Sequence, residues 1–218
     1  MISQTEENYL KAIYKITERE GKSASTNAIA AAMNTAAASV TDMIGRLDKK
    51  GYVCYVKSKG ATLSDEGAQM AKSLIRKHRL WEVFLCEKLG YSWDECHELA
   101  EELEHIQSNN LINRLDSFLG NPQYDPHGDP IPDANGNFAT RAQVLLSEMT
   151  IGQKGTVVGV QEHSPSFLQF LDSQKLVLGA KVEILEVYEF DDSVKILLND
   201  ATQLTLSNKV SQNIFIKK

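Results

Sequence analysis

The stretch STNAIAAAMNTAAASVTDMIGRLDKKG, residues 25–51, predicts two helices joined by a tight turn. A short helix is predicted from Ser25 to Met33, and residues 34–36 supply a turn. Gly51 provides a stop for the second helix. The second helix carries an apolar stripe of Val40, Ile44 and Leu47. A helix, a three-residue turn and a second helix together predict a helix-turn-helix.

The neighbouring stretches extend this unit in both directions. Residues 3–18 repeat apolar side chains at helical spacing, and residues 65–89 predict a long helix. Between the motif and the long helix, YVCYVKSKGATLS (residues 52–64) contains two β-like runs around a basic turn. Helix, helix, turn, helix and basic hairpin is the order of a winged helix-turn-helix.

The polar side chains of the second helix and the hairpin are suited to DNA. Hydroxyls and cations can contact phosphates, and short side chains let a helix enter the major groove. Alanines at the start of the helix leave base recognition to thymine methyl groups and DNA shape. We expect DNA contacts from Thr35, Ala38, Ser39, Thr41, Asp42, Arg46, Lys49, Lys57 and Lys59. The alternative is that the lysines only solvate a surface hairpin.

Charge is unevenly distributed along the 218 residues. The formal net charge is −6, but residues 1–80 carry a net +5, residues 81–140 a net −10 and residues 141–218 a net −1. The basic head suits nucleic acid, although the whole-chain charge argues against it. The chain is 42% hydrophobic, which is ordinary for a globular protein, and has no run long enough to span a membrane. Three cysteines without C-x-x-C spacing, and no signal-peptide pattern, favour the cytoplasm.

The acidic middle contains ligand-type side chains at helical spacing. His97, Glu101, Glu104 and His105 stand at i, i+4, i+7 and i+8, which places them on about one third of a helix circumference. The preceding helix carries His78 and Glu82 at i and i+4. The alternative is a solvated acidic face, but a divalent cation would relieve the repulsion among so many carboxylates. We therefore expect a metal site.

The donor types indicate which metal this site would take. Carboxylates and imidazoles without thiolate favour Mn(II) or Fe(II) over a tetrahedral zinc site. Cys96 is next to His97 in sequence but is expected to project away from the ligand face. Cys86 could reach that face, although core packing is the commoner role for such a cysteine.

A loop rich in Pro, Gly, Asn and Asp, residues 120–137, separates the helical part from the rest of the chain. After residue 151 the pattern changes to short alternating runs such as TVVGV and SVKILL. The fold class predicted is therefore mainly α with a C-terminal all-β module.

Four motifs and the C-terminal module resemble the family of metal-dependent transcriptional repressors that includes the diphtheria toxin repressor and the manganese transport regulators. The motifs are Asn8-Tyr-Leu-Lys-Ala-Ile-Tyr14, Arg76-Lys-His-Arg-Leu-Trp-Glu82, Glu101-x-x-Glu104-His105 and Asp125-Pro-His-Gly-Asp-Pro-Ile-Pro132. The resemblance implies a winged-helix domain over residues 1–72 and a helical dimerisation and metal-binding domain over 73–140. A linker over 141–150 and an SH3-like domain over 151–218, similar to iron-transport accessory proteins, would follow.

The resemblance also assigns metal ligands. A primary site would use Glu101, Glu104 and His105 with Asn8, where relatives have Asp or Met, or with the neighbouring Glu7. Glu101 stands where the iron-responsive branch has Cys, and this harder ligand favours manganese. An ancillary site would draw on His78, Glu82 and His97, with further ligands from Asp125, His127 and His163.

The function implied is that of a homodimeric repressor of metal-uptake genes on a palindromic operator, and not of an enzyme or a membrane protein. The dimer interface is expected among Leu80, Trp81, Phe84, Leu85, Leu111, Ile112, Leu115 and Phe118, each of which could instead belong to the monomer core. One alternative is a winged-helix regulator with a small organic effector. A metallohydrolase is a further alternative, although the chain lacks H-E-x-x-H and an obvious general base.

Overall fold

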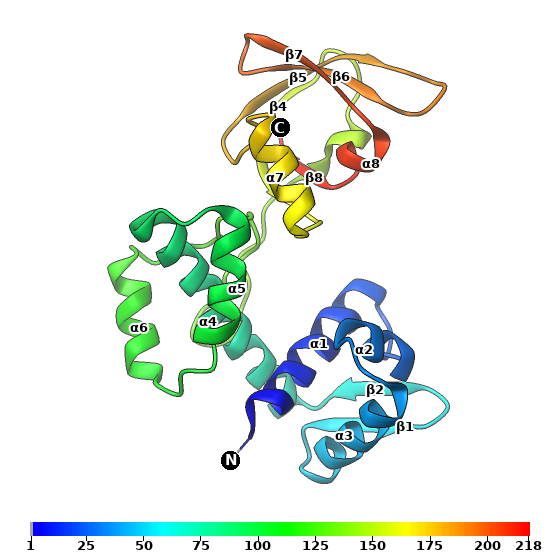
Figure 1. Ribbon diagram of the computed structural model, residues 1–218, viewed down its shortest axis with the longest axis vertical. Coiled ribbons are helices and arrows are strands. Elements are labelled where there is room, and N and C mark those ends of the chain that lie inside the picture. Colours follow the sequence, from blue (N-terminus) through cyan, green and yellow to red (C-terminus); the bar gives the residue numbers. More distant parts are fainter. Residues whose placement is uncertain (1) are drawn as a thin grey trace. The chain divides into compact units, whose positions relative to one another are not determined.

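The computed structural model describes residues 2–218 and divides the chain into two compact units. The first unit takes the chain up to His78, together with Leu103–Ser108 and Pro132–Asn137. The second unit takes Arg79–Glu102, Asn109–Ile131 and Phe138–Lys218. Figure 1 shows the order of the helices and strands along the chain.

Three helices on one apolar core make up most of the first unit. α1 (Gln4–Glu20) begins with a capping box, in which the side chains of Ser3 and Glu6 each accept a hydrogen bond from the other's backbone N–H. α2 (Thr26–Ala32) and α3 (Ala37–Lys49) form the predicted helix-turn-helix. Their apolar faces meet in a core that includes Leu10, Ile13, Ile29, Val40, Ile44 and Leu47.

A two-stranded wing completes the DNA-binding fold. β1 (Val53–Val56) pairs antiparallel with β2 (Gly60–Leu63), and Ala24 forms an additional bridge to β2. Gly60 has φ +96, and a Cβ at this position would lie 2.4 Å from the carbonyl oxygen of Ala24. Only glycine permits this close approach. The winged helix-turn-helix predicted from the sequence is confirmed.

α4 (Asp65–Leu89) has the bounds predicted from the sequence and contributes residues to both units. In the second unit its last turns pack with α6 (Asn109–Phe118). The small core between them contains Leu80, Val83, Ile112, Leu115 and Ile131. Among residues 2–218, no helix combines the length and apolar character that crossing a bilayer requires.

The acidic helix is shorter than predicted. α5 (Trp93–Leu103) ends before Glu104 and His105, which lie in the turn that follows. Glu104 is fully buried in an ion pair with Lys11, and this tertiary contact overrides the local helical preference. The expectation that Glu104 and His105 share one helix face with His97 is therefore wrong.

An antiparallel sheet with strand order β3-β8-β4-β5-β6-β7 forms the C-terminal part of the second unit. Its strands are β3 (Val144–Leu145), β4 (Lys154–Val160), β5 (Lys181–Val187), β6 (Val194–Leu198), β7 (Thr202–Leu206) and β8 (Ile214–Lys217). The core of the sheet also receives apolar side chains from α7 (Pro165–Ser173). Short helices η1 (Leu146–Glu148) and α8 (Asn208–Ser211) complete the module. The predicted fold class is confirmed, and residues 144–148 of the expected linker are folded.

Candidate metal centre and nucleic-acid interface

A buried carboxylate in the second unit lies between two histidines. Glu82 on α4 has a side chain only 2% exposed, and its Oε1 lies 2.9 Å from Nδ1 of His97 on α5. The same oxygen lies 3.7 Å from Nδ1 of His127, which comes from the loop after α6. Three elements distant in sequence thus bring one carboxylate and two imidazoles together.

Asp125 organises the loop that carries His127. Its Oδ1 accepts two hydrogen bonds from backbone N–H groups of the loop, at 2.8 and 2.9 Å, and its Oδ2 lies 3.4 Å from Nε of Arg79. The turn at Gly128 has φ +86, and a Cβ there would lie 2.0 Å from the carbonyl oxygen of Val158. The loop therefore lies directly against β4, at a distance that only glycine allows.

The charges around Glu82 alter the protonation of its neighbours. Burial acts to lower the pKa of His127, but contact with Glu82 and the charge of Asp125 outweigh it and raise the pKa to about 9. Burial, followed by the charge of Glu82, raises the pKa of Asp125 to about 7. Both raised pKa values reflect the negative charge of the neighbouring carboxylates, and this charge attracts cations, among which a metal ion would have to displace the proton of His127.

His163 and Cys96 lie beside these groups. The rings of His163 and His127 are 5.1 Å apart between centroids. Cys96 is buried, and its Sγ lies within 4.8 Å of the ligand atoms of Glu82 and His127. The expectation that Cys96 projects away from the ligands is wrong, because α4 and the loop after α6 bring Glu82 and His127 within 4.8 Å of its Sγ. We call Glu82, His97, His127 and His163 the second-unit cluster.

Another group of expected ligands lies in the first unit, where a lysine joins it. Lys11 Nζ donates to both carboxylate oxygens of Glu104, each at 2.7 Å. Nδ1 of His78 lies 2.7 Å from Glu104 Oε2, and Nδ1 of His105 lies 2.6 Å from Oε2 of Glu7. We call Lys11, Glu104, His78, His105 and Glu7 the first-unit cluster.

The structure does not place all the expected ligands in one unit. Asn8 lies in the first unit, and its Oδ1 is buried without a hydrogen-bond partner among the described residues. Glu101 lies in the second unit, is 37% exposed and has its Oε1 3.9 Å from Nε2 of His97. The expected ancillary set is divided as well, since His78 belongs to the first unit and Glu82 to the second.

The DNA-facing side chains expected from the sequence are all exposed. Those on α3 or its preceding turn are Thr35, Ala38, Ser39, Thr41, Asp42, Arg46 and Lys49. The wing contributes Lys57 and Lys59, both exposed. Arg46 pairs with Asp42 one helical turn away, and Thr41 Oγ1 donates to the carbonyl oxygen of Ala37 at 3.0 Å. Because its apolar stripe is buried in the core, α3 presents this polar face outward.

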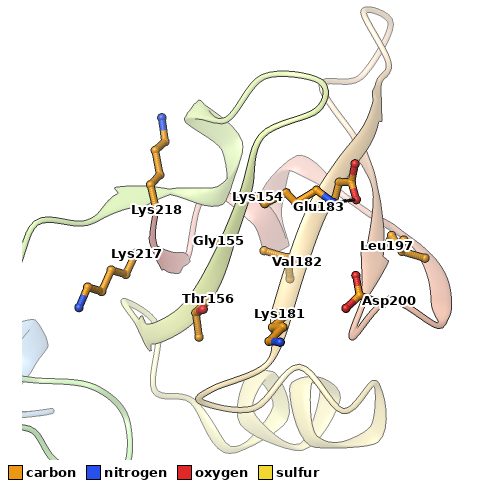
Figure 2. A pocket seen from close by; sticks show the side chains of 10 residues that line it. All are labelled: Lys154, Gly155, Thr156, Lys181, Val182, Glu183, Leu197, Asp200, Lys217 and Lys218. Carbon is orange, nitrogen blue, oxygen red and sulfur yellow. Dashed lines mark ion pairs between the residues drawn. The ribbon is translucent and has the colours of Figure 1, made fainter.

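A hollow of about 630 Å³ in the C-terminal sheet contains none of the expected site residues. Figure 2 shows side chains from neighbouring strands around it, with Lys154 and Glu183 pointing toward one another. Their Nζ and Oε2 atoms are 2.9 Å apart. The other lysines that line the hollow are Lys181, Lys217 and Lys218.

The sequence pattern did not indicate that Lys11 contacts the first-unit cluster or that Arg79 contacts the loop of the second-unit cluster. Lys11 stands about 200° around α1 from the apolar Tyr9, so its position in the helix suggests a solvated face. Its burial depends on a turn about ninety residues later in the chain, which no local pattern reveals. Arg79 contacts Asp125 only because the loop after α6 returns to α4.

Three protein-family models match the chain in succession. Residues 1–61 match "Iron dependent repressor, N-terminal DNA binding domain". Residues 64–133 match "Iron dependent repressor, metal binding and dimerisation domain", and residues 144–218 match "FeoA domain". Both clusters thus contain residues from the range that matches the metal-binding and dimerisation model.

Comparison with individual proteins also finds metal-dependent repressors. The iron-dependent repressor IdeR of Mycobacterium leprae is 32% identical over 160 residues, 72% of this chain and 69% of that protein. The diphtheria toxin repressor of Corynebacterium diphtheriae is 27% identical and covers 84% of each chain. A solved structure described as a manganese-dependent transcriptional repressor complex with manganese is 34% identical, with a TM-score of 0.84 over 97% of this chain and 98% of that one.

Proposed function

The chain belongs to the family of metal-dependent, DNA-binding transcriptional repressors that includes the diphtheria toxin repressor, and we propose that the second-unit cluster is the site through which Mn(II) controls its binding to DNA. The family is one of repressors and not of enzymes. The observation that carries the proposal is the buried Glu82 carboxylate shared by His97 and His127. A divalent cation held there would neutralise the Glu82 carboxylate and take the place of the proton that His127 otherwise holds.

The donor set supports manganese over metals that prefer sulfur. Glu82 offers carboxylate oxygen, while His97, His127 and His163 offer imidazole nitrogen, a set suited to Mn(II) or Fe(II). The nearest thiol is a poor ligand in its resting state, because a hydrogen bond with Cys86 and burial raise the pKa of Cys96. Its Sγ also lies 3.3 Å from the carbonyl oxygen of Trp93, to which it donates.

The exposed face of α3 and the wing support the DNA-binding part of the proposal. Two copies of the chain would place two recognition helices on the two halves of a palindromic operator, about one DNA turn apart. Uptake genes for the same metal are the expected targets, and the cytoplasm, where such DNA is accessible, is the expected location. Metal can raise operator affinity only to the extent that it binds the DNA-binding conformation more tightly than other conformations of the chain. Such a coupling is typically about 1–3 kcal/mol.

The decisive experiment measures operator affinity during anaerobic titration with Mn(II), Fe(II) and Zn(II). The operator is first selected from random duplexes in the presence of Mn(II). We expect Mn(II) to tighten binding at least about tenfold and Glu82→Gln to abolish this gain, because the variant loses the shared carboxylate. Glu87→Gln, on the same helix but with a side chain 59% exposed, is the matched control and should respond as the wild type does.

Two results would contradict the proposal. Equal operator affinity with and without metal would remove the metal-dependent control. A full Mn(II) response in folded Glu82→Gln would place the control elsewhere in the chain.

A further inference from the structure

We infer that Arg141 is a positioning residue of the second-unit cluster: its guanidinium group holds the loop that carries His127 against β4 and so determines where this imidazole lies. Arg141 is half-buried, precedes β3 in the chain and belongs to the second unit. The inference rests on the proposed function, because it takes His127 to be a ligand of Mn(II).

The first observation is a bulge in β4. The pairing of β4 with β8 shifts its register between Val157 and Gly159, so the ladder passes over Val158. A bulge directs the peptide group of the extra residue out of the regular pairing. The carbonyl oxygen of Val158 accepts a hydrogen bond from Nη2 of Arg141 at 2.7 Å.

The same nitrogen of Arg141 joins the bulge to the loop. Nη2 also donates to the carbonyl oxygen of Gly128 at 2.8 Å. The Cζ atom of Arg141 lies over the ring of Tyr124, 4.1 Å from its centroid, so the planar guanidinium group contacts the start of the loop as well. One cation thereby connects two backbone segments through charge-assisted hydrogen bonds.

His127 lies next to this connection. Its backbone carbonyl oxygen accepts a hydrogen bond from the N–H of Val160 in β4 at 3.0 Å. Its ring Nε2 donates to the carbonyl oxygen of Trp93 at 3.2 Å, and Nδ1 is the ring nitrogen close to Glu82. A hydrogen bond at one imidazole nitrogen orients the other toward a metal. The backbone of β4 therefore controls the direction of a ligand atom.

The connection also relates two histidines of the cluster to each other. β4 ends at Val160, and His163 follows three residues later. Because Arg141 holds the His127 loop on the end of this strand, it keeps the two imidazole rings at their centroid separation of 5.1 Å. Loss of the guanidinium group would release the loop and separate the ligands.

The test measures Mn(II) affinity by calorimetric titration of the full-length protein, at the site that Glu82→Gln removes. Arg141→Met should weaken binding about tenfold or more, which is a typical effect of losing a group that orients a metal ligand. Arg141→Lys should recover part of this loss, because an ammonium group can donate to both carbonyl oxygens but cannot stack on Tyr124. Arg114→Met, which removes an exposed arginine of α6, is the matched control and should bind as wild type does.

A double variant distinguishes positioning of His127 from general stability. If Arg141 acts through His127, Arg141→Met should cause no further loss of Mn(II) affinity in a His127→Gln background, since no imidazole remains to be positioned. A purely structural role would instead lower the affinity by the same factor in both backgrounds.

The outcomes separate the inference from the proposed function. Unchanged Mn(II) affinity in folded Arg141→Met, or additive losses in the double variant, would overturn the inference while the loss of binding in Glu82→Gln upholds the proposed function. If Arg141→Met does not fold, Arg141→Lys replaces it in the same comparison. If Glu82→Gln binds Mn(II) as wild type does, the proposed function fails, and a loss shared by Arg141→Met and His127→Gln would still uphold the role of Arg141.

Discussion

At the residue scale, Glu6 shows how one carboxylate serves two contacts in the DNA-binding unit. It accepts a hydrogen bond from the backbone N–H of Ser3 at 2.9 Å, and Lys50 Nζ, from the residue after α3, lies 2.6 Å from its Oε1. The hydrogen bond with Lys50, followed by that from Ser3, lowers the pKa of Glu6 from its ordinary 4.5. The start of α1 is thereby joined to the end of the recognition helix.

Glu6→Gln should lower the free energy of unfolding by about 1 kcal/mol at neutral pH, since the helix cap weakens and the ion pair is lost. Because folding lowers the pKa of Glu6, its contribution is present above the unfolded value near 4.5 and disappears as the pH falls through the folded value. Urea unfolding at pH 7 and pH 3 measures the difference. Glu18→Gln, on an exposed position of the same helix, is the control. An equal deficit at both pH values would contradict the assignment.

At the scale of elements, the loop after α6 determines where His127 lies, and Gly128 determines how closely that loop approaches β4. A methyl group at this position would collide with the Val158 carbonyl oxygen, and the positive φ disfavours any side chain. The position of one imidazole in the second-unit cluster therefore depends on the backbone of the neighbouring residue.

Gly128→Ala should weaken Mn(II) binding about tenfold or more, because the loop must move away from β4 and take His127 with it. Calorimetric titration of the variant measures the change. Gly120→Ala is a matched control, since Gly120 also has positive φ but a Cβ at that position would meet nothing within 4 Å. Similar losses in both variants would show that backbone strain alone is responsible.

Elements with a strong local pattern could be predicted from the sequence, whereas contacts between distant segments could not. The stripe of Val40, Ile44 and Leu47 predicted the recognition helix because helical spacing is a local property. β7 and α7 were not predicted, since TQLTL and PSFLQFLDS are short runs whose burial depends on the rest of the sheet. The end of α5 was misplaced for the same reason.

The sequence predicted which types of residue form the candidate site, but only partly which of these residues lie together. Ligand-type side chains at Glu82 and His97 could be recognised from helical spacing, and they do lie together. The sequence could not show that Cys96 lies close to Glu82, or that Lys11 lies close to Glu104. Both contacts form only when separate helices and turns come together in the fold. The metal-ligand roles of all these residues stay predictions.

At the scale of the whole molecule, α6 carries apolar surface that the second unit does not cover. Leu111 is 40% exposed and Phe118 is 66% exposed, whereas Ile112 and Leu115, also expected at the dimer interface, are buried in the core. Exposed large apolar side chains within a range matched by a dimerisation domain are candidates for the contact between two copies.

Phe118→Asp should shift the chain from dimer to monomer at micromolar concentration, because a charge would be placed within an apolar interface. Light scattering coupled to size-exclusion chromatography measures the mass in solution. Phe190→Asp, at a fully exposed position between β5 and β6, should leave the dimer unchanged. A stable dimer of folded Phe118→Asp would place the interface on another surface.

The first unit is assembled from three separate stretches of the chain, the last of which ends at Asn137. A gene fragment that stops after the wing would encode α1 without the turn that carries Glu104, and Lys11 would lose its contacts with that carboxylate. Recombination that exchanged this DNA-binding segment as one contiguous piece would therefore separate Lys11 from Glu104. We therefore expect the DNA-binding segment to acquire a new DNA specificity more readily by substitutions on α3 than by transfer into another protein.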